Sequence, residues 1–185
     1  FGSQFMLGLT IAGVASSLLV TVFGLFHVDV FLRAYKLPLQ TYSFGNIVFS
    51  IINTANDVLG AWWLDSMVAH ETSRSDMIGI AGCIFAVCFL APFFRWKTPS
   101  TRWDGLHFIV SMSLYDTLYS FMAILLGSLV TDNHHMNDHQ RVWFMASGKI
   151  ANLIPAFVVA RIGLLVFDED DMSRFRAFLV GLAVV

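Results

Sequence analysis

The chain has 185 residues, of which 57% are hydrophobic, 15% are aromatic and only 13% are charged, and its mean hydropathy is +0.70. Soluble domains carry roughly 25% charged residues. About half of the usual charge is therefore missing, and lipid must cover much of the surface. The formal net charge of -2 gives no electrostatic footprint for nucleic acid, which is excluded as an expected partner.

Apolar stretches long enough to cross a membrane follow one another along the chain. A helix needs roughly 17 to 25 residues to span a hydrocarbon core of about 30 Å. We predict five full spans and an incomplete sixth, at residues 5–26, 41–64, 77–94, 106–130, 142–167 and 175–185. The predicted fold class is an all-α membrane protein in which residues 1–185 form a single six-helix bundle.

The connections between these spans are short and hold most of the charge. Short connections predict that successive helices run antiparallel as neighbours in one bundle. Lys and Arg gather in the first, third and fifth connections, which the positive-inside rule places in the cytoplasm, with the N-terminus outside. Because the chain begins at Phe1 without a methionine and stops within an apolar stretch, we expect a piece of a longer protein.

Polar and small side chains fall on single faces of three predicted helices. Such stripes recur every third or fourth residue, as one face of a helix does. They are Thr10, Gly13, Ser17, Thr21 and Gly24 in the first span, Asn46, Ser50, Asn53, Asp57 and Gly60 in the second, and Asp116, Ser120, Ala123 and Gly127 in the fourth. Close helix packing through small residues explains the first stripe, but it does not explain the carboxylates and amides of the other two.

A carboxylate deep in a membrane is costly unless it faces a partner, a cation or water, so Asp57 and Asp116 should point inward. Asp57 and Lys149 lie at similar depths from one membrane face, each roughly 10 Å from the end of its predicted helix, which allows an ion pair. The alternative is a cation or proton site in which Asn53 and Asn56 supply neutral oxygens around Asp57. We favour the cation or proton site.

The fourth connection contains two histidines, His135 and His139, at the i, i+4 spacing that zinc can use on a helix. No third ligand in a fixed frame accompanies them, so a solvated loop is the preferred interpretation and no metal site is predicted. The spans also lack a nucleophile–base pair, so we do not expect an enzyme.

Four segments resemble known transporters. The segment NDVLGAWWLD at 56–65 resembles the Asn-Asp-Pro-x-x-Gly-x-x-x-Asp signature of the glycoside–pentoside–hexuronide cation symporters, a family of the major facilitator superfamily. FHVDVF at 26–31 is similar to the aromatic-x-x-Asp-Val segment after that family's first helix, while LYD at 114–116 and RFRAF at 174–178 look like the vertebrate transmembrane protein 180 group. The resemblance covers the whole chain. It implies the six-helix N-terminal half of a transporter, with the sixth helix truncated and, contrary to the charge rule, the N-terminus in the cytoplasm.

The chain departs from this family where the family binds sugar and cation. The family's acidic residues on the first and fourth helices correspond to about Gly13 and Ala123, and the first acid of the second-helix pair corresponds to Asn53. Asp57 alone remains of that set, and Val58 replaces the signature proline. A sodium ion shared among several carboxylates is therefore not expected here.

These features predict a secondary active transporter-like membrane protein that moves a sugar or another small solute together with a cation. The predicted cation or proton site is Asp57, Asn53 and Asn56, with Na⁺ or H⁺ as the coupling ion and no other cofactor. The predicted lining of the solute cavity is Asp116, Tyr115, Ser17, Thr21 and Lys149. The alternative is a non-transporting receptor, scaffold or lipid-handling protein. The expected partners are the lipid bilayer, a small solute and a C-terminal six-helix half of the same protein, and we favour the plasma membrane over an organelle.

Overall fold

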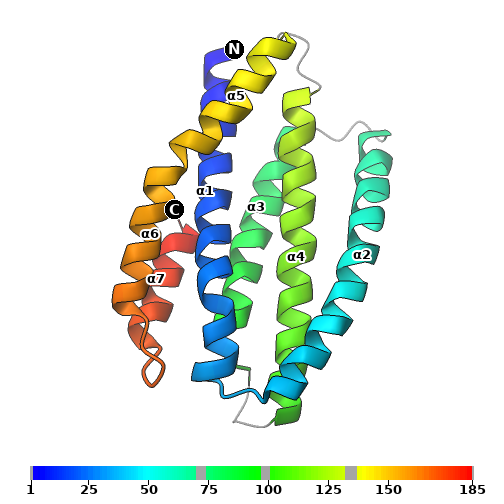
Figure 1. Cartoon of the computed structure of the whole chain (residues 1–185). Coiled ribbons are helices and arrows are strands. Elements are labelled where there is room, and N and C mark those ends of the chain that lie inside the picture. Colours follow the sequence, from blue (N-terminus) through cyan, green and yellow to red (C-terminus); the bar gives the residue numbers. More distant parts are fainter. Residues whose placement is uncertain (1, 70–73, 97–100, 132–136, 185) are drawn as a thin grey trace.

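The computed structural model describes residues 2–69, 74–96, 101–131 and 137–184, and the regular elements in these ranges are all helical (Figure 1). In chain order they are α1 (Gly2–Asp29), the π-helical turn η1 (Val30–Ala34), α2 (Leu39–Ala69), α3 (Arg74–Leu90), the 3₁₀ turn η2 (Ala91–Phe93), α4 (Thr101–Thr131), α5 (Asp138–Ala151), α6 (Leu153–Val166) and α7 (Ser173–Val184). The prediction of an all-α protein is confirmed.

Three of the described helical stretches are long and apolar enough to cross a membrane, namely Leu7–Ala34, Arg102–Val130 and Arg141–Val166. Met77–Phe93 is apolar but shorter. The predicted span 41–64 lies within α2, which has the length but is interrupted by amide side chains. The apolar helices and the low charge content together identify an integral membrane protein.

The predicted fifth span, 142–167, is not one regular helix. α5 ends at Ala151 and α6 begins at Leu153, with Asn152 between them in a turn. Pro155 has no N–H to donate to the carbonyl of Ala151 four residues earlier, so the ladder of helical hydrogen bonds is interrupted here. Figure 1 shows the change of direction between α5 and α6 that results.

The core of the bundle is aromatic and is shared by α1, α3, α4 and α7. Its largest fully buried side chains include Phe26 of α1, Phe85 of α3, Phe108 of α4 and Phe175 of α7. The rings of Phe26 and Phe175 lie with their centroids 4.9 Å apart. α6 packs against α1, where a Cβ added to Gly163 would lie 2.6 Å from Cε2 of Phe26. Ring packing of this kind fixes how the four core helices sit together.

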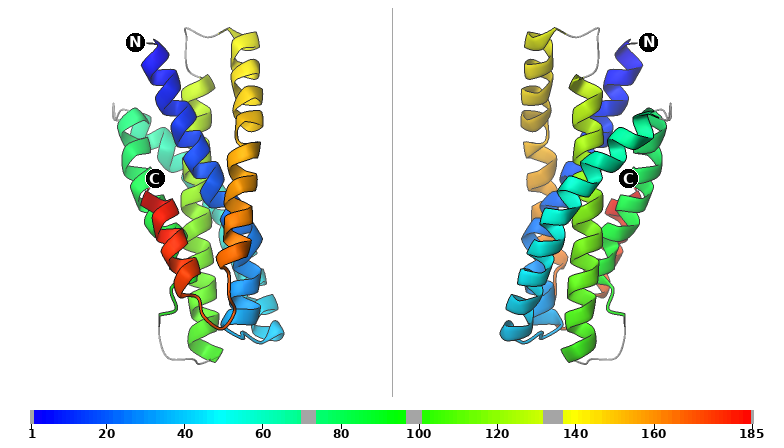
Figure 2. Two further views of the ribbon diagram at one scale, coloured as in Figure 1. Left: turned by 90° about the vertical axis from the view of Figure 1, so that its left-hand side faces the viewer. Right: turned by 90° about the vertical axis from the view of Figure 1, so that its right-hand side faces the viewer.

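α2 packs chiefly against α4, although the short connections predict that it lies beside α1 and α3. Two glycines account for this crossing. A Cβ on Gly45 would lie 2.6 Å from Cδ1 of Phe108, and a Cβ on Gly105 would lie 2.8 Å from Cγ2 of Thr41. Beyond the crossing, α2 swings away from α4 (Figures 1 and 2), and Trp62 near its C-terminal end is exposed.

Exposed tryptophans mark two levels along the bundle. One level contains Trp96, just after η2, and Trp103, in the first turn of α4, which is the lower end of the bundle in Figure 1. The other level contains Trp62, near the end of α2, and Trp143, near the start of α5. Tryptophan is enriched at both membrane–water interfaces, so we expect these levels to lie near the boundaries of the hydrocarbon core. Asn152 follows Trp143 by nine residues. It therefore lies roughly 14 Å from one boundary, close to the middle of a core of about 30 Å.

Candidate functional site

A hydrogen bond between α2 and α4 lies at the centre of the candidate site. Nδ2 of Asn56 donates to Oγ1 of Thr117, and that hydroxyl donates in turn to the carbonyl of Ser113 at 2.6 Å. Asn56 lies roughly 9 Å along its helix from Trp62, and Thr117 lies roughly 21 Å along its helix from Trp103. The two lengths together match a hydrocarbon core of about 30 Å, so we expect the bond to lie at membrane depth.

Hydroxyl groups near this bond are satisfied by their own helices. Oγ of Ser50 donates to the carbonyl of Asn46 at 2.8 Å, and Oγ1 of Thr54 donates to the carbonyl of Ser50 at 2.9 Å. These bonds use the hydroxyl protons and leave oxygen lone pairs available. Ser50, Thr54 and Thr117 are all exposed. We call the surface formed by Ser50, Thr54, Asn56 and Thr117 the polar face; its neutral oxygens can accept hydrogen bonds from a solute or coordinate a cation.

Asp116 and Tyr115 are adjacent on α4 but have different surroundings. Asp116 is half-buried on the turn that carries Thr117. Tyr115 is 4% exposed; its ring stacks on that of Phe23 from α1 at a centroid distance of 3.5 Å and lies 5.5 Å from that of Phe85 from α3. Tyr115 therefore belongs to the aromatic core, whereas Asp116 borders the polar face.

Ser17 and Thr21 lie one turn apart on α1, and both are half-buried. Oγ1 of Thr21 donates to the carbonyl of Ser17 at 2.8 Å, so this hydroxyl also bonds to its own helix. The next turn carries Phe23, which meets Tyr115 of α4. At Phe23, α1 thus contacts α4 through aromatic rings. Ser17 and Thr21 lie on the part of α1 just before this contact.

The remaining candidates lie on α2 and α5. Asn53 is half-buried one turn before Asn56. Lys149 is exposed on α5. Figure 1 shows α5 and α2 on opposite sides of the bundle. Lys149 lies roughly 9 Å along its helix from Trp143, so it and Asn56 lie at similar depths. Asp57 is part of α2, but its side chain is outside the described residues, and so is its predicted pairing with Lys149.

A charged cluster at one end of the bundle was missed by the reasoning from sequence. Arg95, which follows η2, contacts Asp104 in the first turn of α4 through Nε to Oδ1 at 2.7 Å and Nη2 to Oδ2 at 2.5 Å. Nη2 also donates to the carbonyl of Tyr35 at 3.2 Å. Asp104 is 5% exposed. Hydrogen bonding to this carboxylate raises the pKa of the Arg95 guanidinium.

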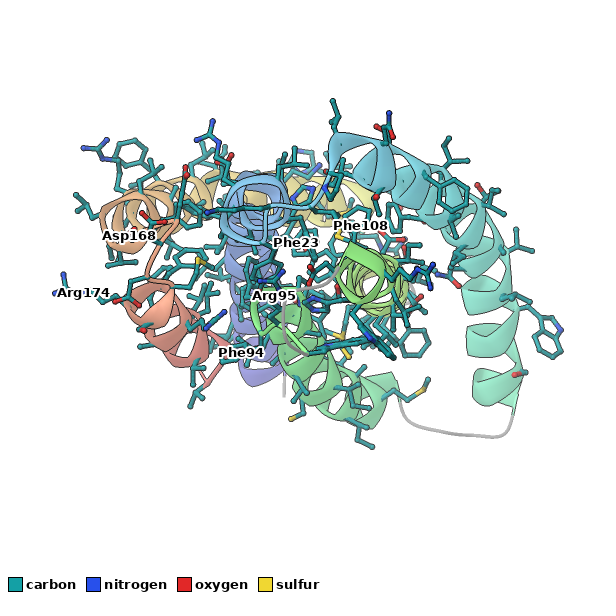
Figure 3. All side chains as sticks on the ribbon, turned by 90° about the horizontal axis from the view of Figure 1, so that it is seen from below. Phe23, Phe94, Arg95, Phe108, Asp168 and Arg174 are labelled. Atoms are coloured by element: carbon teal, nitrogen blue, oxygen red, sulfur yellow. The ribbon has the colours of Figure 1, made fainter. Side chains whose placement is uncertain are left out.

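The cluster ties together three connections that are distant in the sequence. Nε of Arg176, in the first turn of α7, donates to the carbonyl of Phe93 in η2 at 2.9 Å. In Figure 3, Arg95 is enclosed by the helices, whereas Arg174 points outward from α7. The signal that could have revealed the pair is Asp104 itself, because an acidic residue in the first turn of a helix is often placed for an electrostatic reason.

The described part of the chain offers few side chains that could bind a metal ion. No group of three or more His, Cys, Asp or Glu side chains that could hold a metal ion occurs there. His139 is exposed at the start of α5, and His135 lies outside the described residues. The described groups best suited to a small cation are therefore the neutral oxygens of the polar face, with Asp116 beside them.

Comparison with known proteins finds relatives of this chain. The chain is 30% identical over 205 residues to transmembrane protein 180 of Mus musculus, and 25% identical over 186 residues to transmembrane protein 180 of Gallus gallus. The alignments cover 96% and 90% of this chain but 37% and 34% of the relatives, so the chain spans about a third of their length. No family model and no solved structure matches it. Similarity over nearly the whole chain supports homology between this all-α integral membrane protein and transmembrane protein 180.

Proposed function

We propose that this chain forms part of a secondary transporter of the major facilitator type, which moves a small solute across the membrane together with a cation. The observation that carries the proposal is the polar face between α2 and α4. Exposed hydroxyls and an amide at membrane depth are poorly placed against lipid, which offers no hydrogen bonds. They are well placed against a solute, water or a second protein element.

The second element in this proposal is another part of the same protein. The relatives are nearly three times as long as the aligned region, since 37% and 34% of their lengths are covered. A second six-helix half packed over α2 and α4 would enclose the polar face. In secondary transporters the solute site lies near the middle of the membrane at such an interface between repeats.

The chemistry of the face favours a neutral polyhydroxylated solute such as a sugar. Asn56 and Thr117 offer neutral acceptors, and Asn53 lies one turn away. For the coupling ion, Na⁺ or H⁺, we propose Asp57 with the oxygens of Asn53 and Asn56. Binding of the cation would alter the relative stability of inward-open and outward-open states, which is how ion and solute movement become coupled.

A non-transporting receptor, scaffold or lipid-handling protein is the second candidate. The observation that favours it is the shortage of carboxylates beside the polar face, where Asp116 is the described acidic residue. Such a protein would keep the bundle and the interface between its halves without moving a solute.

The test is uptake by the full-length protein reconstituted in liposomes, with a panel of labelled sugars and an imposed Na⁺ or H⁺ gradient. We expect gradient-dependent uptake of at least one sugar, and a fall of more than tenfold in Asn56→Leu. The matched control is Leu165→Ala on the outer side of α6, which should transport normally because that side chain is 80% exposed and far from the polar face. Folded protein that takes up no sugar under either gradient would favour the non-transporting alternative.

A further inference from the structure

Two buried polar side chains lie with their rings close together where η1 meets the first turns of α4. Tyr35, directly after η1, is 5% exposed, and His107 of α4 is 1% exposed. Their ring centroids lie 5.8 Å apart with the planes tilted by 33°. Phe31 and Trp96 flank the histidine at centroid distances of 5.5 Å and 4.8 Å, so the two polar rings are enclosed by aromatic ones.

His107 offers a hydrogen-bond acceptor to this space. Its Nε2 lies 2.8 Å from the carbonyl of Ala91. A carbonyl can only accept, so Nε2 carries the proton and Nδ1 of the neutral imidazole carries the lone pair. Nδ1 is buried and has no hydrogen-bond partner among the described residues. Such a buried acceptor destabilises the folded state, because it has lost its hydrogen bond to water without gaining one to the protein.

Tyr35 offers the complementary donor. Its hydroxyl is buried without a hydrogen-bond partner in the described part of the chain. The guanidinium of Arg176 lies beside it, but a guanidinium only donates and supplies no acceptor for the hydroxyl proton. Arg95 lies over the ring, 5.2 Å from its centroid, and holds both oxygens of the nearby Asp104. The charged groups around Tyr35 therefore leave its proton unsatisfied.

The backbone that carries Tyr35 has the features of an adjustable segment. η1 is a π-helical turn, a form that is rare and often found at functional sites. Lys36, the next residue after Tyr35, has a positive φ of 55°, which is uncommon for a residue other than glycine. A change in this turn would move the Tyr35 hydroxyl relative to α4, and the fully buried Val30 and Phe31 of η1 would repack with it.

We propose that Tyr35 and His107 form a catch, in which the Tyr35 hydroxyl donates to Nδ1 of His107 in a second conformation of the protein. The described conformation is the open state of this catch, in which the two rings lie close together and the donor and the acceptor are both unpaired. Closing it joins the end of α1 to the start of α4, at the end of the bundle where Arg95 and Arg176 already tie η2 to its neighbours. The catch belongs to the fold, and it does not depend on the proposed transport.

Thermal unfolding of the full-length protein in detergent tests the catch, because the proposal predicts whether Tyr35→Phe raises or lowers the Tm. Removing a hydroxyl that stays unpaired raises the Tm, whereas removing one that is hydrogen-bonded lowers it. The proposal requires the closed conformation to be the populated one in detergent, so we expect Tyr35→Phe to lower the Tm by roughly 2 to 4 °C, whereas the described open conformation alone would give a rise. The matched control is Tyr42→Phe, whose half-buried ring packs on Phe108 at a centroid distance of 4.7 Å and whose loss of hydroxyl should leave the Tm unchanged.

A double-mutant cycle identifies the acceptor. His107→Gln keeps an amide N–H at the position of Nε2 for the Ala91 carbonyl and removes the Nδ1 acceptor. In this background Tyr35→Phe should lower the Tm no further, because the bond is already lost. A rise or no change in Tm for Tyr35→Phe alone, or an equal fall in both backgrounds, would overturn the proposal.

If the His107 variant does not fold, nitrogen NMR of the wild-type protein decides the question. With ¹⁵N-labelled histidine, the Nδ1 resonance of His107 should shift between wild type and Tyr35→Phe, because it senses the hydrogen bond that it accepts. An Nδ1 resonance that is identical in the two proteins would reject the catch.

Discussion

Helices α4 and α6 lie in the same bundle but turn opposite kinds of surface outward. α4 buries Phe108 and Leu125 completely in the core, and Thr117 on another side is exposed. α6 is the reverse case. Apart from Arg161, its exposed side chains are large and apolar, with Phe157 exposed by 68% and Leu165 by 80%.

The difference separates two kinds of exposed surface in a membrane protein. An apolar surface such as that of α6 is satisfied by lipid, because hydrocarbon tails are as apolar as leucine. A polar surface at the same depth is not, because lipid cannot replace the hydrogen bonds of water. Exposure alone therefore carries no functional meaning here, and the polarity of the exposed side of α4 is what marks the candidate site.

The largest expected effect lies at the buried end of α4. Arg95→Met should lower the free energy of unfolding by about 3 to 5 kcal/mol, because the carboxylate of Asp104 would remain buried without its partner. Unfolding in denaturant, followed by circular dichroism, measures this. The double variant Arg95→Met with Asp104→Leu should recover most of the loss, since no charge is then left uncompensated. A double variant as unstable as the single one would show that packing, not charge, holds this end together.

The next effect tests how α2 reaches the polar face. Gly45→Ala should destabilise the protein by about 1 to 3 kcal/mol, because the new Cβ would lie 2.6 Å from the fully buried ring of Phe108. The control is Gly60→Ala in the same helix, where no atom lies within 4 Å. That variant should be neutral or stabilising, because alanine is the better helix former. Equal effects of the two substitutions would mean that α2 does not cross α4 at Gly45.

Much of the fold can be predicted from the sequence, because a membrane helix is recognised by the length and the low polarity of its segment. The described helices follow the apolar stretches in chain order, except that the single predicted stretch 142–167 holds both α5 and α6. α4 begins at Thr101, before the predicted start at residue 106. The crossing of α2 over α4 was not predictable from connection length. It depends on Gly45 meeting Phe108 and Gly105 meeting Thr41, which are contacts between residues distant in the sequence.

The candidate site was predictable only as far as helix periodicity reaches. Periodicity placed Asn53 and Asp57 on one face of α2, but it left out Asn56, the residue that hydrogen-bonds to Thr117 of α4. It could not show that Tyr115, one residue from Asp116, turns into the aromatic core to stack on Phe23. The break at Asn152 could have been inferred from Pro155, because a proline removes one helical hydrogen bond wherever it occurs inside a span.

A smaller, stabilising effect is expected at the turn after η1. Lys36 has a φ of 55°, a conformation that costs a residue with a Cβ roughly 1 kcal/mol. Lys36→Gly removes that cost but also loosens the unfolded chain, so we expect a net gain of about 0.5 kcal/mol in the free energy of unfolding. Lys36→Ala keeps the Cβ and should give no gain. If alanine stabilises as much as glycine, the lysine charge rather than the backbone is responsible.

The smallest effect concerns Asp171, which lies in the connection between α6 and α7, outside the apolar spans. Its Oδ1 accepts hydrogen bonds from the hydroxyl and the N–H of Ser173, the first residue of α7, and these hold the pKa of the carboxyl below its ordinary value of 3.8. A group whose pKa is lowered by folding stabilises the protein above its unfolded pKa, and that contribution disappears as the pH falls through the folded value. The Tm of the wild type should therefore decline more steeply below about pH 4 than that of Asp171→Asn, which has no charge to lose. Ser173→Ala should flatten the same part of the profile, because it removes the hydroxyl that favours the ionised carboxyl. If the Tm of the wild type and that of Asp171→Asn change in parallel between about pH 3 and pH 5, the contact between Asp171 and Ser173 does not stabilise the start of α7.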